Sequence, residues 1–327
     1  MSTLVESRGL TKHFALGRGQ TVHAVDDVSL EIAEREILGL VGESGSGKST
    51  YGKTLLGLHE KTRGEAYFRG ERLPDRYAAA DFQRLAPLMQ MIFQDPYSSL
   101  NPRMTVGEII GEGPRLVGGV GRQAQREQVE EWLERVGLES GHASRYPHEF
   151  SGGQRQRVGI ARALIMRPQF VVCDEPISAL DVSVQAQVVR LLGELKESLG
   201  LTLLFIAHDL SMVRYVSDRM AVMYLGTVVE LGAADDVYFR PCHPYTQALV
   251  ASNPEPDPAA ERDRPTLRIH GEIASPVNVR AGCRFAGRCP RVMDVCRKET
   301  PLLKPVAAQP GDAGTQRLVA CHLFDGG

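Results

Sequence analysis

The sequence predicts an α/β fold with a parallel-sheet core, an antiparallel sheet and a small C-terminal domain that contains cysteines. Residues 3–33 alternate apolar and polar side chains, which is typical of strands in a half-exposed antiparallel sheet. A glycine-rich stretch at 42–50 lies between an apolar run and a helix-forming segment. Two later apolar runs, 170–173 and 201–207, are followed by acidic residues or a histidine, as in buried parallel strands that end at a site.

The first strand region carries one aromatic residue of interest, Phe14. Its ring could stack on a nucleotide base, an interaction worth roughly 1–3 kcal/mol. Packing in the core is an equally good interpretation of a single phenylalanine, so the strand pattern alone leaves both open.

The glycine-rich stretch reads GESGSGKST and fits the P-loop pattern G-x-x-x-x-G-K-[ST]. Glycines let backbone N–H groups approach phosphate oxygens, and the following helix adds the positive end of its dipole. We expect Lys48 to reach the β- and γ-phosphates and the Ser49 hydroxyl to bind Mg²⁺. The residues expected to bind nucleotide here are Gly42, Ser44, Gly45, Gly47, Lys48, Ser49 and Thr50.

The segment between the P-loop and residue 150 predicts strands and one amphipathic helix. Residues 64–70 and 89–94 read as short strands, the second ending in Gln94, and 95–102 is dense in turn-forming residues. Residues 122–136 favour a helix, and their apolar residues recur at spacings of 3 and 4. We interpret that apolar face as core packing.

A second anion-binding helix start is predicted at 151–154. Ser151 can cap the helix, and Gly152 and Gly153 leave backbone N–H groups uncovered before Gln154. Two anion sites about a hundred residues apart in one chain are unusual unless two chains share their nucleotides.

The apolar run at 170–173 ends in two carboxylates. Asp174 suits a water-mediated hold on Mg²⁺, and Glu175 suits general-base action on water, in preference to a plain helix cap. Residues 178–181 end in Asp181. His208 follows the next apolar run, at the carboxyl edge of a parallel strand where ligands bind in open α/β sheets.

The composition is that of a globular protein, with 43% hydrophobic and 24% charged residues among 327. The net charge of −2 predicts no strong attraction to nucleic acid. No apolar run reaches the ~18 residues of a membrane span, and residues 1–8 lack the apolar region of a signal peptide. We therefore expect a protein of the reducing cytosol, in which cysteines do not form a disulfide framework.

These motifs together resemble an ABC transporter ATPase subunit over about residues 4–250. Walker A at 42–50, Gln94, the SGGQ sequence at 151–154, Walker B at 170–175, residues 178–181 and His208 occur in the order and rough spacing of that family. Residues 155–158, 173–176, 178–187 and 243–249 resemble its oligopeptide/dipeptide (peptide/nickel) importer branch. The fold implied is a RecA-like core with antiparallel β and helical subdomains.

The resemblance implies roles and partners. ATP and Mg²⁺ are the implied ligands, with adenine stacked on Phe14, Gln94 near Mg²⁺ and the attacking water, and His208 on the γ-phosphate. The 151–154 loop would face the nucleotide of a second ATPase subunit, and Asp181 would communicate across that interface. Two permease subunits and, indirectly, an extracytoplasmic solute-binding protein would complete an importer of short peptides at the cytoplasmic face of the membrane.

Domain boundaries follow from composition and from the resemblance. We expect an ATPase domain at 1–252, with its helical subdomain at about 95–167. A proline-rich linker at 253–265 and a C-terminal domain at 266–327 follow. Two alternative functions are a soluble ABC-type ATPase and an exporter ATPase. A soluble ABC-type ATPase of DNA repair or translation usually carries a long coiled-coil insertion or tandem cassettes, whereas this sequence has one P-loop and no such insertion. An exporter ATPase would not explain residues 243–249 or the C-terminal cysteines, which resemble the importer branch.

Four cysteines gather in the C-terminal domain, at spacings that predict a metal centre: Cys283, Cys289, Cys296 and Cys321. Zinc sites usually use paired C-x₂₋₄-C motifs, whereas the gaps here are five and six residues. A [4Fe–4S] cluster suits such spacing better. Cys289 is followed by Pro290, as the last cysteine of many ferredoxin motifs is followed by proline. Zinc and free thiols remain the alternatives, and His322 is a reserve ligand.

Overall fold

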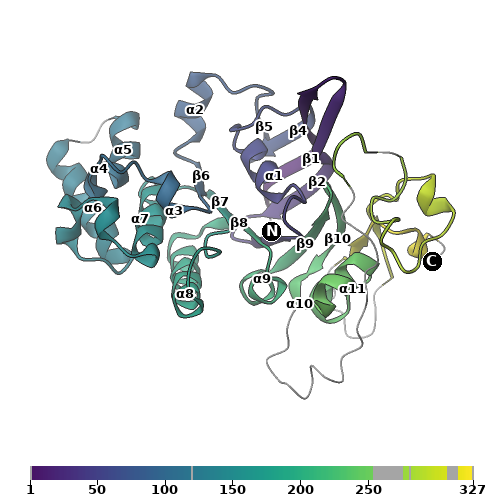
Figure 1. The fold of residues 1–327 in the computed structure, drawn as a ribbon. Coiled ribbons are helices and arrows are strands. Elements are labelled where there is room, and N and C mark those ends of the chain that lie inside the picture. Colours follow the sequence, from purple (N-terminus) through teal and green to yellow (C-terminus); the bar gives the residue numbers. More distant parts are fainter. Residues whose placement is uncertain (1, 119–120, 253–274, 280, 308–315, 326–327) are drawn as a thin grey trace, which may run out of the picture. The chain divides into compact units, whose positions relative to one another are not determined.

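A computed structural model describes residues 2–118, 121–252, 275–279, 281–307 and 316–325 (Figure 1). The predicted linker at 253–265 lies outside these residues. The chain forms two compact units. The first unit comprises Met1–Leu4, Ala33–Glu36 and Arg76–Phe205, and the second comprises Val5–Ile32, Ile37–Asp75 and Ile206–Gly327.

The first unit contains most of the helices. Its helices are α2 (Ala79–Leu85), α3 (Pro96–Ser99), α4 (Val106–Ile110), α5 (Glu112–Val117), α6 (Arg122–Arg135), α7 (Gly152–Leu164) and α8 (Val182–Leu199), with 3₁₀ turns at Ser140–Ser144 and Pro147–Glu149. Its strands β6 (Met89–Ile92) and β7 (Phe170–Asp174) pair in parallel, with Met89 opposite Phe170. Strand β8 (Thr202–Ala207) runs from this unit into the second.

Two predictions for this unit can be compared directly with the structure. The helix expected at 122–136 is α6, and its apolar residues Val129, Trp132 and Leu133 are buried, which confirms the core interpretation. The segment 95–102 is not wholly a loop, because it contains α3. Asp95 caps that helix by accepting a hydrogen bond from the Tyr97 N–H at 2.8 Å, and proline occupies its first turn.

The second unit contains the expected antiparallel sheet, with strand order β2-β1-β4-β5. Its strands are β1 (Thr3–Gly17), β2 (Gln20–Ala33), β4 (Arg63–Phe68) and β5 (Glu71–Arg72). The alternating pattern of residues 3–33 therefore gave the correct strands. Strand β1 continues past Phe14, however, because the hairpin turns only at Arg18 and Gly19, whose positive φ angles suit a tight turn.

The second unit also contains a mixed set of strands that supports the P-loop. Strand β3 (Ile37–Val41) is parallel to β9 (Arg219–Tyr224), and β10 (Thr227–Ala233) is antiparallel to β9. Every residue of β3 is buried, as the apolar run before the P-loop predicted. The helices of this unit are α1 (Lys48–Leu55), α9 (Leu210–Val216), α10 (Ala234–Phe239) and α11 (Pro244–Ala251).

The C-terminal segment extends this set of strands. Strand β12 (Leu318–Val319) pairs with β10, and β11 (Lys304–Pro305) pairs with β12. Short 3₁₀ turns form at Val295–Arg297 and His322–Phe324. The buried Arg317 guanidinium lies 3.3 Å from the buried Glu230 carboxylate of β10, so an ion pair joins this segment to the strand beside it.

Candidate functional site

The P-loop conformation depends on two glycines. Gly47 caps α1 with a φ of 106°, and a Cβ atom there would lie 2.0 Å from the Ala24 carbonyl oxygen. A Cβ at Gly42 would lie 2.1 Å from the Met223 carbonyl oxygen. Because both contacts are with backbone, no larger residue fits without moving a strand. The loop is held close against its neighbours while Ser44 and Gly45 lie exposed at its tip.

Lys48 lies at the centre of the loop. Its side chain is buried, and its ammonium donates hydrogen bonds to the carbonyl oxygens of Gly42 at 2.7 Å and Glu43 at 3.0 Å. Ser49 and Thr50, half-buried, begin α1. This is a compact loop with a cation inside it at the N-terminus of a helix, which is the arrangement that binds phosphate groups.

Phe14 lies half-buried on β1. The Lys12 ammonium lies 4.6 Å from the centre of its ring, and the His59 ring meets it edge-on at 5.4 Å. The side chain is therefore not in the closed core, and base stacking remains the prediction for it.

Gln94 and Glu175 are brought together in the first unit although 81 residues separate them in sequence. The Gln94 amide nitrogen donates to a Glu175 carboxylate oxygen at 2.9 Å. Asp174 ends β7 and is 2% exposed. Glu175 follows it with a φ of 44°, a left-handed conformation that is uncommon outside glycine and that clusters at functional sites.

The 151–154 segment forms the helix start that its sequence predicted. The Ser151 hydroxyl accepts from the Gln154 N–H at 3.3 Å, and the Gln154 side chain accepts from the Ser151 N–H at 3.0 Å. This reciprocal capping box begins the 13-residue helix α7. A Cβ at Gly153 would lie 2.5 Å from a Val184 methyl group of α8, whereas Gly152 is exposed.

The remaining predicted site residues lie at the ends of elements. Asp181 precedes α8 and is exposed. His208 follows β8 and is exposed in the second unit.

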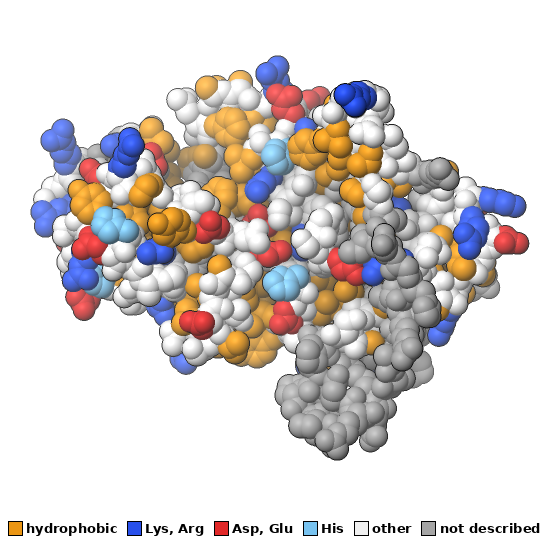
Figure 2. Space-filling model, viewed as in Figure 1, with side chains coloured by type: hydrophobic (Ala, Val, Ile, Leu, Met, Phe, Trp, Pro, Cys, Tyr) orange, Lys and Arg blue, Asp and Glu red, His pale blue; other side chains and the backbone are white. Residues whose placement is uncertain are grey.

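On the face shown in Figure 2, the Lys and Arg side chains of the described residues are scattered among acidic and hydrophobic ones. This distribution suits the small net charge of the chain.

The four C-terminal cysteines lie close enough to influence one another. The Cys283 N–H donates to the Cys296 carbonyl at 2.7 Å. The pKa of the Cys283 thiol is raised to about 11, mainly by burial and also by the thiols of Cys296, Cys321 and Cys289. Cys242, which lies outside this group of four in the sequence, packs in a buried cluster with Cys321.

His322 does not suit the reserve role that its position suggested. Its Nδ1 lies 2.6 Å from an Asp325 carboxylate oxygen, and its Nε2 lies 3.0 Å from the Glu299 carbonyl oxygen. Both ring nitrogens are therefore already engaged. The pKa of this imidazole is raised, first by the Glu299 carbonyl and also by Asp325.

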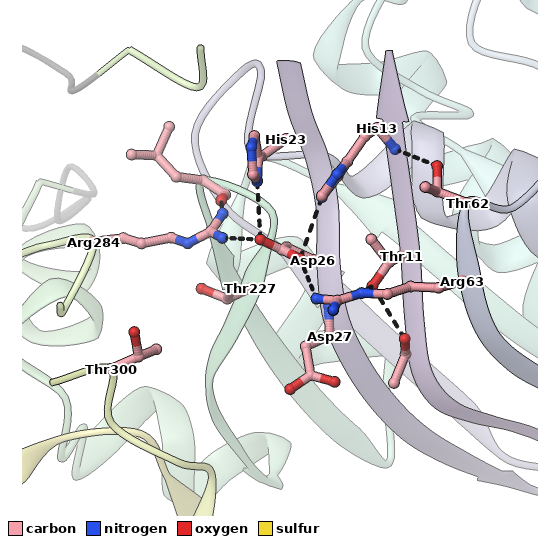
Figure 3. Close-up of polar contacts among 12 residues, drawn as sticks. Thr11, His13, His23, Asp26, Asp27, Thr62, Arg63, Thr227, Arg284 and Thr300 are labelled. Carbon is pink, nitrogen blue, oxygen red and sulfur yellow. Dashed lines mark hydrogen bonds and ion pairs between the residues drawn. The ribbon is translucent and has the colours of Figure 1, made fainter. Parts of the chain in front are cut away.

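A polar cluster around Asp26 was not expected from the sequence (Figure 3). Within the described residues, His13, His23 and Asp26 are the three ligand-type side chains whose donor atoms lie within 4.8 Å of one another. The carboxylate also pairs with Arg63 at 3.1 Å and with Arg284. Burial alone would raise the pKa of Asp26, but His23 and Arg284 outweigh it and lower the pKa to about 2. Two guanidinium groups on one carboxylate oppose a metal cation there.

Comparison with known proteins identifies the family. A family model described as "ABC transporter" matches residues 25–178, and one described as "Oligopeptide/dipeptide transporter, C-terminal region" matches residues 229–296. The oligopeptide transport ATP-binding protein OppF of Escherichia coli is 48% identical over 314 residues, covering 92% of each chain. The chain belongs to the ABC transporter family. OppF of Bacillus subtilis is 57% identical to this ABC subunit over 262 residues, covering 80% of this chain and 86% of that protein.

Solved structures place the same fold in ATP-binding cassettes. The ATP-binding cassette MJ0796, solved as a dimer in a post-hydrolysis state with ADP and Pi, is 29% identical to this ABC subunit, with a TM-score of 0.65. The match covers 71% of this chain and 99% of that one. CbiO1 from Clostridium perfringens is 26% identical, with a TM-score of 0.65, over 73% of this chain and 92% of that one. The predicted ABC ATPase fold is therefore confirmed.

Proposed function

We propose that this chain is the ATP-hydrolysing subunit of a membrane importer for oligopeptides or dipeptides. The contact between Gln94 and Glu175 carries the proposal, because it sets a carboxylate and an amide together at the end of a buried strand. Glu175 would take a proton from the attacking water, while Gln94 would orient that water and Mg²⁺. The names of both OppF relatives support peptides as the transported solute.

Binding of MgATP is assigned to the P-loop and the residues around it. Lys48 would turn from its two loop carbonyls to the β- and γ-phosphates, and Ser49 would bind Mg²⁺ with Asp174 acting through water. Phe14 would stack on adenine, and His208 would contact the γ-phosphate. Mg²⁺ supplies charge neutralisation when bound, and the chain supplies the binding groups and the base.

The active form is a head-to-tail pair of ATPase subunits. The N–H groups of Gly152 and Gly153, at the capped start of α7, would bind the γ-phosphate held by the other subunit, and Asp181 would carry the signal across that interface. The dimeric MJ0796 cassette, bound to ADP and Pi, supports this pairing. Two permease subunits would anchor the pair at the cytoplasmic face of the membrane. None of the helices in the described ranges is long and apolar enough to span a membrane.

The division into domains also remains our proposal. It consists of an ATPase domain at 1–252, with a helical subdomain at about 95–167, and a C-terminal domain at 266–327 after a linker at 253–265.

Co-purification tests the proposed function directly. The full chain, tagged and expressed in its native cell, would be recovered from detergent-solubilised membranes and its partners identified by mass spectrometry. We expect an ATPase partner and two proteins with many membrane spans, together with ATP-driven peptide uptake in reconstituted vesicles. Recovery with soluble or nucleic-acid-bound partners alone would contradict the proposal, as would ATP-driven export from the vesicles.

The four C-terminal cysteines would hold a [4Fe–4S] cluster with a structural role. Four thiols lie together, yet no three of their sulfur atoms, all within the described residues, come within 4.8 Å of one another. A tetrahedral zinc site with Zn–S bonds of about 2.3 Å needs sulfurs about 3.8 Å apart. The wider donor set favours the larger cluster over zinc. The descriptions of the relatives name no metal.

Metal analysis separates these outcomes. Protein purified without oxygen should be brown, with about four irons per chain if all four thiolates bind one cluster. Colourless protein with one zinc per chain would support zinc, and metal-free protein with four titratable thiols would exclude both metals. Cys173 and Cys242 are counted separately, by comparison with a chain in which the four C-terminal cysteines are replaced by serine.

A further inference from the structure

Residues 283–296, called the cysteine segment, contain two arginines that contact the P-loop and its neighbouring strands within the second unit. Arg284 directly follows Cys283, and Arg288 directly precedes Cys289. Arg288 contacts the P-loop, and Arg284 contacts strand β2 and the turn between β9 and β10. Neither contact was expected from the sequence, because more than 240 residues separate the partners in each ion pair.

Arg288 binds the P-loop carboxylate of Glu43 with both ends of its guanidinium. The two N–H···O distances are 3.0 Å and 3.2 Å, and the two side chains are 11% and 23% exposed. The Tyr224 hydroxyl lies 3.4 Å from the same guanidinium, and the Tyr245 hydroxyl accepts from the Glu43 N–H at 2.9 Å. Such a two-point, partly desolvated pair is stronger and more specific than a surface ion pair.

Arg284 makes a second set of contacts, with strand β2 and with the turn between β9 and β10. It donates to the Asp26 carboxylate (Figure 3) and to the Leu225 carbonyl oxygen. The next residue, Gly226, donates its N–H to the P-loop carbonyl of Ser46 at 2.8 Å and accepts from the Asp26 N–H at 2.8 Å. The cysteine segment therefore contacts the loop directly through Glu43, and it contacts the backbone that supports Ser46.

The charge of Glu43 explains why such a contact matters for nucleotide binding. Its carboxylate belongs to the loop that closes on a triphosphate, and the Lys48 ammonium is hydrogen-bonded to its carbonyl oxygen. An unpaired carboxylate there would repel the phosphates and compete for Lys48. Arg288 neutralises the Glu43 carboxylate and keeps it directed toward the cysteine segment.

We propose that Arg288 is a positioning residue for the nucleotide site, supplied to the P-loop by the cysteine segment and acting through Glu43. The proposal rests on ATP binding at the P-loop, which belongs to the proposed function. It assigns a role in nucleotide affinity to a segment outside the nucleotide-binding motifs. Arg284 supports the same arrangement by fixing the turn that contacts Ser46.

Equilibrium binding of ATP, ADP and AMP to the full chain tests this role. Arg288→Gln should weaken ATP binding about tenfold and AMP binding much less, because repulsion by the freed carboxylate grows with the phosphate charge. Glu43→Gln in the same chain should restore ATP affinity, since no carboxylate is then left unpaired. Arg288→Lys should retain part of the affinity, because lysine keeps the charge but not the two-point contact.

Arg297 offers a matched control. It also adjoins a cysteine of the same segment, Cys296, but its side chain is exposed. Arg297→Gln should leave the affinity for all three nucleotides unchanged.

The results separate this inference from the function on which it depends. A parent chain that binds no ATP would contradict the proposed function itself. A parent chain that binds ATP, with Arg288→Gln equally tight, would overturn only the role of Arg288. Equal losses of ATP and AMP affinity in Arg288→Gln would indicate that Arg288 only supports the fold. A Glu43→Gln/Arg288→Gln chain that binds ATP no more tightly than Arg288→Gln would indicate the same. Either result would overturn the proposed role of Arg288. Circular dichroism establishes that each variant is folded, and Arg288→Lys provides the test if Arg288→Gln is not.

Discussion

The Gln94 amide donates a 2.9 Å hydrogen bond to the Glu175 carboxylate, which the backbone holds in a left-handed conformation at the end of β7. This contact fixes the direction of the carboxylate. A carboxylate held in this way is suited to accept a proton from water.

Glu175→Gln should therefore retain ATP binding and lose turnover by roughly 10²–10⁴-fold, the usual contribution of a general base. Steady-state phosphate release and nucleotide binding measure the two effects separately. Glu149→Gln is a control, because Glu149 is an exposed carboxylate of the same unit that caps only its own 3₁₀ turn. Near-parental turnover in Glu175→Gln would mean that another group is the base.

Gly47→Ala should disrupt the P-loop. The added methyl group would meet the Ala24 carbonyl at 2.0 Å, at a φ of 106° that alanine rarely adopts. Strain of this kind costs on the order of 1–3 kcal/mol, so both nucleotide affinity and the free energy of unfolding should fall. Gly193→Ala in α8 meets no atom within 4 Å and should stabilise the chain by roughly 0.5–1 kcal/mol. Unchanged ATP affinity in Gly47→Ala would show that the loop can relax.

His243 should make the stability depend on pH. Burial lowers the pKa of its imidazole to about 3, and its ring nitrogen accepts from the Tyr245 N–H at 3.0 Å. The unfolded chain binds a proton at this residue below a pH of about 6.5, whereas the folded chain stays neutral. Stability should thus fall as pH decreases from 6.5 toward 3, by up to about 1.4 kcal/mol per pH unit.

Urea unfolding at pH 7.5 and 5.5 measures this dependence. His243→Asn keeps an acceptor for the Tyr245 N–H and should reduce the slope. His148→Asn replaces an exposed histidine and should leave the slope as in the parent. If the free energy of unfolding changes equally with pH in all three chains, the pH dependence comes from groups other than His243.

The ion pair between Glu230 and Arg317 should hold the C-terminal strand in place. Arg317→Met leaves a fully buried carboxylate without its cation, a change that costs about 3–5 kcal/mol. Glu230→Gln in the same chain should recover part of this loss. The Lys304–Asp325 pair is exposed, so Lys304→Met should cost about 1 kcal/mol or less. Similar costs for both pairs in thermal unfolding would contradict this account.

The sequence could predict the features that depend on short segments. The Ser151 cap, the buried strand before the P-loop and the buried face of α6 each follow from a local pattern. Glycine spacing likewise predicted the loop around Lys48, although the Ala24 contact that requires Gly47 comes from another strand. Such features can be predicted because the residues that produce them are close together in the sequence.

The contacts that sequence reasoning missed join residues far apart in the chain. Nothing in the sequence around Arg288 indicates a pairing with Glu43, since most arginine side chains are exposed, as Arg297 is. Cys242 packs on Cys321, which follows β12, the strand that pairs with β10. The sequence predicts His322 as a reserve ligand, but in the fold the Glu299 carbonyl oxygen lies 3.0 Å from its Nε2. These relationships depend on topology, which spacing along the chain does not encode.

The sharing of each ATP between two chains is the central claim, and a mixing experiment tests it most directly. Lys48→Ala removes the P-loop cation and Ser151→Arg blocks the γ-phosphate contact, so each variant alone should be nearly inactive. A mixed pair has one site with both defects and one site with neither. We predict that the ATPase activity of the mixture at micromolar concentration will rise well above that of either variant alone and will fall on dilution. A mixture no more active than its components, with a parent rate per chain that stays constant on dilution, would contradict the account.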